Sequence, residues 1–351
     1  MKKEKGDSCF LLLFSLLILT VLLIGCKANT VSEAPAPPEE AGEEESTDTI
    51  EEEEPEPLGE PSPFTGLPVA EIYNRPYAII VENLLQARPQ SGLSAAEIVY
   101  EVPVEGYITR FLALFISPYE DDIGPVRSAR PYLAYIAKEY DGILAHCGYS
   151  IHTEAVLKAI DAKHIDERFN SLYFKRIKSR NMPHNLYTTL SRLAVGAEKF
   201  NYLQGSSPAP AFSFVERDVP EHIVSSISIT FSNQNHVEYR WSSGNTYTRF
   251  NDGSLFIDAN YGEAVEVKNI IIQFVQARTF TDEGHLEITL TGEGNGLLFS
   301  GGTVEEIKWE KNGYEEKTRF IGTGGQEIQV LPGNTWIHLV PQSGKVEWSL
   351  N

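Results

Sequence analysis

Three arginines in the first half of the chain could together hold a negatively charged ligand. Arg127 and Arg130 are three residues apart, so one turn of helix would place both on the same face. Ser128 could cap a helix that begins there, and Pro131 suits a first helical turn. Paired guanidinium groups at the N-terminus of a helix suit a carboxylate or a phosphate. We therefore expect Arg127 and Arg130, together with Arg110, to bind an anionic ligand.

The same arginines could instead form internal ion pairs. Glu101 and Glu105 flank the end of a predicted strand and are the obvious structural ion-pair partners. Arginine is the usual choice for internal ion pairs, so the sequence leaves both interpretations open. A further arginine, Arg88, lies in the polar string Ala87 to Ser94 and joins the expected ligand-binding residues.

A second polar motif is His184-Asn185, which lies between Pro183 and Tyr187. The pair could clamp the same ligand, and His184 could act as a general acid or base. A histidine and an asparagine in a loop can equally serve only to satisfy backbone groups. The sequence therefore leaves both a functional and a purely structural role open for this motif.

No metal or cofactor is expected. His146 and His152 are six residues apart, and no Glu stands at the offset that a zinc-dependent hydrolase needs. The sequence has no nucleophile elbow, phosphate-binding loop or dinucleotide fingerprint. Cys147 follows His146 directly, but we expect a buried and unreactive thiol rather than a nucleophile.

The start of the chain predicts a lipoprotein signal peptide over residues 1–26. A positively weighted start precedes an apolar run over residues 10–24, which is shorter than the roughly 20 residues of a membrane-spanning helix. The run ends in Leu23-Ile24-Gly25-Cys26, which suits cleavage before Cys26 and lipidation of its thiol. Two or three acyl chains would hold the protein firmly on the extracytoplasmic face of the cell membrane.

An acidic linker follows at residues 27–61. Residues 31–60 contain 13 Asp or Glu and no Lys or Arg, and no apolar periodicity indicates a folded element. Of the net charge of −20, this stretch contributes −13 and residues 1–30 contribute +2, which leaves −9 for residues 61–351. This balance argues against nucleic acid as a partner.

The remainder is long enough for two domains, with a join rich in Gly, Ser and Pro near residue 205. We expect an N-terminal α/β domain at 62–210 and an all-β, sandwich-like or barrel-like domain at 220–351. The fold class of the whole chain is then α+β with several domains. In the first domain the patterns predict strands at 77–81, 97–102 and 109–116 and helices at 129–139, 154–160 and 186–200.

The second domain is expected to consist almost entirely of short strands. They are predicted at 223–231, 237–241, 246–250, 270–275, 286–290, 307–309, 327–330 and 335–340. All four tryptophans fall in this half, namely Trp241, Trp309, Trp336 and Trp348. Packing in the core or at an edge is one explanation for them, and a stacking platform for sugar rings or a peptide is the other.

Several long strings resemble the YerB-like lipoproteins, a family with paired N-terminal and C-terminal domains of unknown function. In the first domain these are residues 87–94 with 97–101, 105–111, 123–130 and 183–187. In the second domain they are residues 247–250, 268–273 and 333–337. The resemblance spans nearly everything after the acidic linker. It implies a surface-exposed lipoprotein, and it implies no established reaction.

These observations favour a lipid-anchored protein that binds an anionic envelope ligand, a peptide or a membrane-protein partner. The absence of a recognisable nucleophile supports a binding or scaffold role. The alternative is an envelope enzyme that acts on a wall polymer or a lipid-linked glycan, with His184 as acid or base and the arginines holding charge.

Overall fold

The computed structural model describes residues 59–351 except 206–208, 233–234 and 283. The predicted signal peptide, Cys26 and nearly all of the acidic linker lie outside the described residues.

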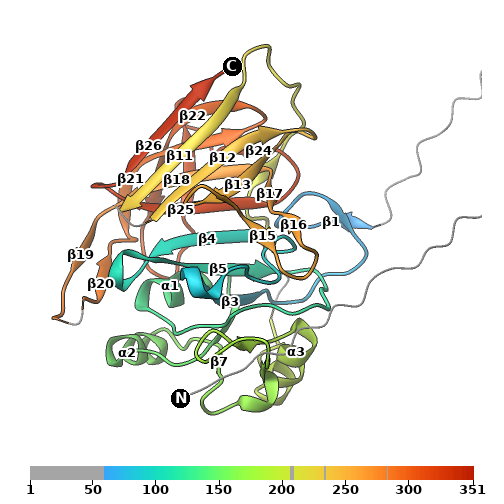
Figure 1. Cartoon of the computed structure of the whole chain (residues 1–351), viewed down its shortest axis with the longest axis vertical. Helices are drawn as coiled ribbons and strands as arrows, with labels where there is room; N and C mark the ends of the chain where they lie inside the picture. Colours follow the sequence, from blue (N-terminus) through green and yellow to red (C-terminus); the bar gives the residue numbers. More distant parts are fainter. Residues whose placement is uncertain (1–58, 206–208, 233–234, 283) are drawn as a thin grey trace, which may run out of the picture. The chain divides into compact units, whose positions relative to one another are not determined.

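A ten-stranded mixed sheet forms the centre of the described residues (Figure 1). Its order is β23-β22-β21-β18-β25-β4-β5-β3-β6-β7, so each half of the chain supplies five neighbouring strands. From the first half come β3 (Tyr77–Glu82), β4 (Ile98–Pro103), β5 (Thr109–Phe115), β6 (Ile143–His146) and β7 (His164–Asp166). From the second half come β18 (Asn269–Val275), β21 (Gly292–Ser300), β22 (Thr303–Lys311), β23 (Arg319–Gly322) and β25 (Thr335–Pro341).

The two halves meet where β25 pairs with β4 in parallel, so the sheet runs without a break across the expected boundary at 210–220. Both faces of the central strands of this sheet are buried, which explains why β3, β18 and β25 read as nearly continuous apolar runs. In β3, for example, Ile79 and Val81 enter one core while Ala78 and Ile80 enter the other.

A second, antiparallel sheet covers one face of the first. Its strands are β11 (Val224–Ser232), β12 (Asn235–Ser242), β13 (Thr246–Asn251), β14 (Ser254–Leu255), β17 (Glu266–Val267) and β26 (Lys345–Leu350). The alternating burial of β11 and β12 shows one face toward the core and one toward solvent.

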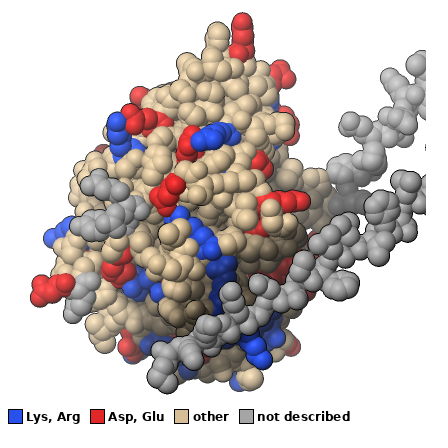
Figure 2. Space-filling view, viewed as in Figure 1, with Lys and Arg blue, Asp and Glu red and all other residues tan. Residues whose placement is uncertain are grey.

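Three α-helices occur among the described residues. Helices α1 (Pro131–Glu139) and α2 (Ile151–Ala159) pack on the face opposite the second sheet, whereas α3 (Leu190–Lys199) contributes to the other core. Ser150 caps α2 and Thr189 caps α3 through their hydroxyl groups. On the face seen in Figure 2, Lys and Arg side chains form a stripe from the centre toward the lower edge.

Short elements complete the fold. The strands are β1 (Glu60–Pro61), β2 (Pro68–Val69), β8 (Lys175–Arg176), β9 (Leu186–Tyr187), β10 (Ser213–Phe214), β15 (Ile257–Asp258), β16 (Glu263–Ala264), β19 (Ala277–Thr279), β20 (Leu286–Ile288) and β24 (Gln329–Val330). The 3₁₀ turns are η1 (Leu85–Ala87), η2 (Glu105–Tyr107) and η3 (Ser171–Tyr173).

The strand-rich character of the chain is as expected, but an α/β first domain is found only in part. Strands of the first half join a sheet that the second half completes, and the predicted helix at 186–200 begins only at Leu190, after strand β9.

The expectation also missed β21. Its three glycines hide the strand pattern, yet a Cβ at Gly294 would lie 2.5 Å from Nε1 of Trp309. Glycine is therefore needed for the indole to pack there.

Two of the tryptophans pack in the core, since Trp336 is fully buried and Trp309 is 3% exposed. Trp309 also donates a hydrogen bond to the carbonyl of Phe274 at 2.9 Å. Trp348 is 43% exposed and contacts Phe299 edge-on.

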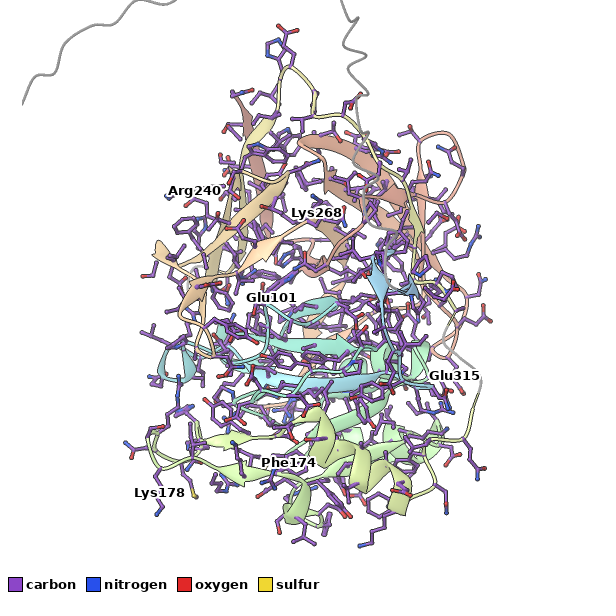
Figure 3. The ribbon with its side chains drawn as sticks, turned by 90° about the vertical axis from the view of Figure 1, so that its right-hand side faces the viewer. Glu101, Phe174, Lys178, Arg240, Lys268 and Glu315 are labelled. Atoms are coloured by element: carbon purple, nitrogen blue, oxygen red, sulfur yellow. The ribbon has the colours of Figure 1, made fainter. Side chains whose placement is uncertain are left out.

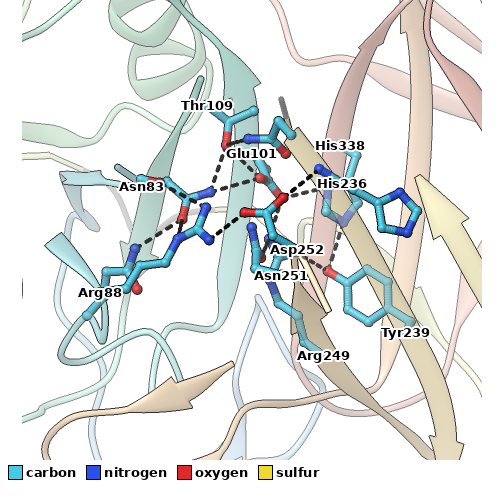
Figure 4. A network of polar contacts seen from close by, with 12 residues as sticks. Asn83, Arg88, Glu101, Thr109, His236, Tyr239, Arg249, Asn251, Asp252 and His338 are labelled. Carbon is cyan, nitrogen blue, oxygen red and sulfur yellow. Dashed lines mark hydrogen bonds and ion pairs between the residues drawn. The ribbon is translucent and has the colours of Figure 1, made fainter. Parts of the chain in front are cut away.

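The junction of the two halves contains a fully buried polar network around Glu101 (Figures 3 and 4). Nη2 of Arg249, from β13, donates to Glu101 at 2.8 Å, and both side chains are 0% exposed. Thr109 and Asn83 donate to the other carboxylate oxygen at 2.6 and 3.2 Å. Three segments far apart in sequence therefore meet at one carboxylate.

The same network fixes the tautomer of His338, which stands opposite Glu101 in the β25–β4 ladder. Tyr239 accepts a hydrogen bond from Arg249 at 2.7 Å, so its hydroxyl hydrogen is free to donate to Nε2 of His338 at 2.9 Å. That leaves Nδ1–H of a neutral imidazole facing Glu101 at 3.2 Å. Burial lowers the pKa of His338, in agreement with a neutral ring.

Replacing Arg249 with Met should lower the free energy of unfolding by about 3–5 kcal/mol, because it leaves the Glu101 charge buried without its partner. Arg278→Met is the matched control, since it breaks an ion pair with Glu287 whose side chains are 77% and 53% exposed. That change should cost less than about 1 kcal/mol. Equal losses in urea unfolding of the two variants would contradict the assigned role of the buried pair.

The stability of the protein should also depend on Glu101 in acid. Burial alone would raise the pKa of Glu101, but the charge of Arg249 and hydrogen bonds from His338 and Thr109 lower it to about 2. The stabilisation should therefore be fully present above about pH 4.5 and be lost as the pH falls toward 2. The difference in unfolding free energy between the wild type and Glu101→Gln should shrink over this range, and a difference that stays constant from pH 7 to pH 2 would contradict the assignment.

Candidate functional site

The arginine site consists of Arg110, Arg127 and Arg130. It lies at the carboxyl ends of the parallel strands β3, β6 and β7. The ladder between β3 and β6 stops at Ile79 and Ala145, and the chain around Arg127 fills the space beyond. The Arg127 N–H donates to the carbonyl of Ile80 at 2.9 Å, and its carbonyl accepts from the Cys147 N–H at 3.0 Å. Crevices at the carboxyl ends of parallel strands are a common place for ligands in such sheets.

Arg127 and His184 share one carboxylate, that of Glu82 at the end of β3. Nε of Arg127 lies 3.0 Å from one oxygen of Glu82, and Nδ1 of His184 lies 2.8 Å from the other. Glu82 is 1% exposed, whereas the side chains of Arg127 and His184 are 23% and 19% exposed. A buried anion therefore orients two side chains that reach the surface.

Arg130 pairs with Glu105 and donates to the carbonyl of Ala129 at 2.8 Å. It is the residue that precedes Pro131, the first residue of α1, and no side chain caps this helix. The expectation that Ser128 caps the helix was therefore wrong, since α1 begins two residues later than the predicted start at 129. Its N-terminal N–H groups lie beside Arg130.

Arg110 differs from its neighbours because it has no carboxylate within 4 Å among the described residues. Its Nη1 donates to the carbonyl of Ser128 at 2.9 Å, and its buried Nε has no hydrogen-bond partner there. Burial and the nearby charge of Arg130 lower the pKa of Arg110 to about 10, so it is still a cation at neutral pH.

An arm from the second half of the chain reaches this region. Strands β19 and β20 pair with each other and extend toward α2 (Figure 1). Beyond them, His285 lies 3.6 Å from Glu105, and the ring of Phe280 lies 5.0 Å from that of His152. No local pattern in the sequence predicts that residues near 280 lie beside residues near 105 and 152.

The remaining expected residues lie elsewhere or have other partners. Arg88 pairs with Asp252 at 2.7 Å, and Asn185 accepts a hydrogen bond from Arg176 at 3.0 Å. Glu101 pairs with Arg249 and not with Arg127 or Arg130, because its side chain points into the junction between the two sheets. Glu82, by contrast, was not singled out in the sequence. The available signal was a charged residue directly after the apolar run at 77–81.

Cys147 is half-buried and its thiol donates to Glu167 at 3.2 Å. Burial raises the pKa of the thiol to about 11, and Glu167 adds to the effect. The neighbouring His146 does not face this sulfur, since its ring nitrogens contact the Gly148 carbonyl and His164. The geometry therefore favours an unreactive thiol.

A hollow of about 580 Å³ lies away from the arginines, at the base of the β19–β20 arm. It opens where the ladder between β18 and β21 stops after Gln273 and Gly296, and Trp309, Phe274 and Asn295 are among its lining residues.

No three His, Cys, Asp or Glu side chains within the described ranges come together in a way that could hold a metal ion. Within the same ranges, no helix has the length and apolar character needed to cross a membrane.

Comparisons with known proteins bear on both halves. The model for the N-terminal domain of a protein of unknown function (DUF3048) matches residues 64–203, and that for its C-terminal domain matches residues 227–337. "Putative lipoprotein YerB" of Bacillus subtilis (strain 168) is 34% identical over 289 residues, which are 80% of this chain and 86% of that protein. The crystal structure of YerB protein from Bacillus subtilis matches with a TM-score of 0.73 and 33% identity, over 82% of this chain and 99% of that one.

The thiol of Cys147 should alkylate slowly at pH 8, because most of it is protonated when its pKa is about 11. Its rate with iodoacetamide should keep rising well above pH 9, and Glu167→Gln should lower the apparent pKa. A rate at pH 8 equal to that of an unstructured cysteine peptide would refute this assignment.

Proposed function

The chain belongs to the DUF3048 family and carries its N-terminal and C-terminal domains in order; from this premise we propose a lipid-anchored protein that binds an anionic ligand of the cell envelope. The anchor is lipidated Cys26, on the extracytoplasmic face of the membrane. The signal-peptide pattern of residues 1–26 and the name of the similar Bacillus subtilis protein support this placement.

The observation that carries the binding proposal is the unbalanced charge of Arg110. Arg127 and Arg130 are each compensated by one glutamate, so Arg110 leaves the three-arginine cluster with one excess positive charge. A buried cation without a counter-ion is costly, and a bound anion would relieve that cost.

The surroundings of Arg110 also suit an anion. The N-terminus of α1 adds the partial positive charge of a helix end, and the side chains of Arg127 and Arg130 are 23% and 12% exposed. Phosphate and carboxylate groups match the fork of an arginine, so the ligand carries one of these two groups.

Replacing both Arg127 and Arg130 with Gln should weaken the binding of pyrophosphate by about a hundredfold or more at low salt. Each charge-assisted hydrogen bond contributes ~1.5–3 kcal/mol, and about 1.4 kcal/mol corresponds to tenfold in affinity. Isothermal titration calorimetry with pyrophosphate, and with a short peptide that has a free terminal carboxylate, would measure the effect.

Two further variants separate binding from folding. Glu105→Gln should tighten binding, because it frees Arg130 from its partner, and this gain cannot come from a damaged fold. Arg278→Gln with Arg319→Gln removes two exposed cations of the second half and should change nothing. If neither probe binds the folded wild type, Arg127 and Arg130 serve only as the ion-pair partners of Glu82 and Glu105.

The pair of His184 and Glu82 favours an envelope enzyme as the second candidate. A buried carboxylate holds Nδ1 of a partly exposed histidine at 2.8 Å, which is how many enzymes orient an acid or base. Nε2 of His184 has no partner among the described residues and is not buried, so it could exchange a proton with a substrate.

For an enzyme of this kind, His184→Ala should abolish turnover of a labelled wall polymer or lipid-linked glycan, with the melting temperature unchanged. Glu82→Gln should lower the rate by a factor of about 10²–10⁴, the usual contribution of acid–base catalysis. An identical product profile from wild type and His184→Ala would exclude this candidate and leave binding as the function.

A further inference from the structure

One stretch of the first half differs in charge from the rest of the chain. Residues 168–197 contain six Lys or Arg and no Asp or Glu, whereas the whole chain has 49 acidic residues in 351. The stretch runs from the loop after β7 through η3, the β8–β9 hairpin and most of α3. Its basic residues are Arg168, Lys175, Arg176, Lys178, Arg180 and Arg192.

Half of these cations are compensated from outside the stretch. Asp166, Glu167 and Asp122 pair with Arg168, Arg176 and Lys175, respectively. The other three are Lys178, Arg180 and Arg192, which have no carboxylate within 4 Å among the described residues; Arg180 and Arg192 donate to backbone carbonyls. The stretch and its partners together therefore keep a net charge of +3.

The most exposed apolar side chains of the described residues lie in or beside this stretch. Leu172 is 78% exposed, Phe169 is 73% exposed and Met182 is 70% exposed. Two others, Leu85 and Ile151, are 72% and 73% exposed; Leu85 begins η1, which follows β3, and Ile151 begins α2, which follows β6. Single exposed apolar residues are common, but three such side chains within a stretch that has three uncompensated cations, with Leu85 nearby, indicate an interaction surface.

Direct contacts join these parts. Arg192 on α3 donates to the carbonyl of Leu172 at 3.3 Å, and the guanidinium of Arg168 lies 5.3 Å from the ring centre of Phe169. Arg180 donates to the carbonyl of Ala87 at 2.6 Å, which brings the loop of Met182 next to the turn that carries Leu85. We call the basic apolar face the set of Lys178, Arg180 and Arg192 with the exposed apolar residues Leu85, Phe169, Leu172 and Met182. Lys178 lies at the lower left of the molecule in Figure 3.

We propose that the basic apolar face docks on the surface of an anionic lipid bilayer. Protruding apolar side chains among lysines and arginines suit the boundary between acyl chains and negatively charged headgroups. The overall charge of −20 does not prevent this, because charges beyond about 8 Å are screened at physiological ionic strength.

The inference rests on the proposed anchor at Cys26 but not on the arginine site. Between Cys26 and the described residues the chain has residues 27–58, which span at most about 110 Å when fully extended. That reach lets any face of the protein touch the membrane, so the surface chemistry decides which one does.

The test uses the acylated full chain in vesicles that contain a lipid with a fluorescence quencher in its acyl chain. A Cys147→Ala background carries one fluorophore, either at Leu172→Cys or at Leu255→Cys in β14, which is 48% exposed. In phosphatidylglycerol vesicles the label at 172 should be quenched and the label at 255 should not. In phosphatidylcholine vesicles, or at high salt, the quenching at 172 should fall.

Charge variants identify the residues responsible. Lys178→Glu with Arg192→Glu should abolish the quenching at 172, since each basic residue near the surface strengthens docking about fivefold. Lys308→Glu with Lys345→Glu, both exposed residues of the second half, should leave it intact. Equal quenching of the two labels, or quenching at 172 that survives Lys178→Glu with Arg192→Glu, would overturn the proposal.

One other occupant would also overturn it, namely the acidic segment 31–60 of the same chain. In that case the label at 172 stays unquenched in both vesicles, and its emission changes when Glu51 to Glu54 are replaced by Gln. The outcome is independent of pyrophosphate binding, which depends on Arg127 and Arg130, so failure of one proposal is distinguishable from failure of the other.

Discussion

The pairing of Arg249 with Glu101 is the contact on which the joining of the two halves depends. Neither charge has access to water, so each is tolerable only while the other is in place. The guanidinium also lies between 4.7 and 5.4 Å from the ring centres of Phe111, Tyr239, Phe256 and Trp336. Phe111 belongs to β5, and the other three rings come from three separate segments of the second half. Together the four rings exclude water from the ion pair.

A continuous central sheet follows from this junction. Because β25 lies against β4, each half buries strand faces that the other half covers, and both cores contain residues of both halves. The first half is therefore not a self-contained α/β unit, and its helices cover only part of the sheet it helps to build. The arm of β19 and β20 is a second place where the first half depends on the second, since it brings His285 to 3.6 Å from Glu105.

At the edge of this sheet, the candidate site is organised by carboxylates. Glu82 holds Arg127 and His184, and Glu105 holds Arg130. Such pairing fixes the directions of the side chains without removing them from the surface, which is what a preorganised binding site requires. In the proposed binding function, the unbalanced charge of Arg110 is the reason to expect an anionic ligand.

The sequence by itself determined what local patterns encode: most strands, the approximate helices and the family resemblance. It also named Arg110, Arg127, Arg130 and His184 as candidate site residues. It could not pair the charges, because an ion pair depends on which strands become neighbours, and Glu101 and Arg249 are 148 residues apart. It also concealed β21, whose glycines make sense only once Trp309 lies over them. Short-range periodicity reports which residues are buried. Only the tertiary structure decided which charges pair, that both halves share one central sheet, and that Arg110 has no carboxylate within 4 Å among the described residues, because each depends on segments that are distant in the sequence.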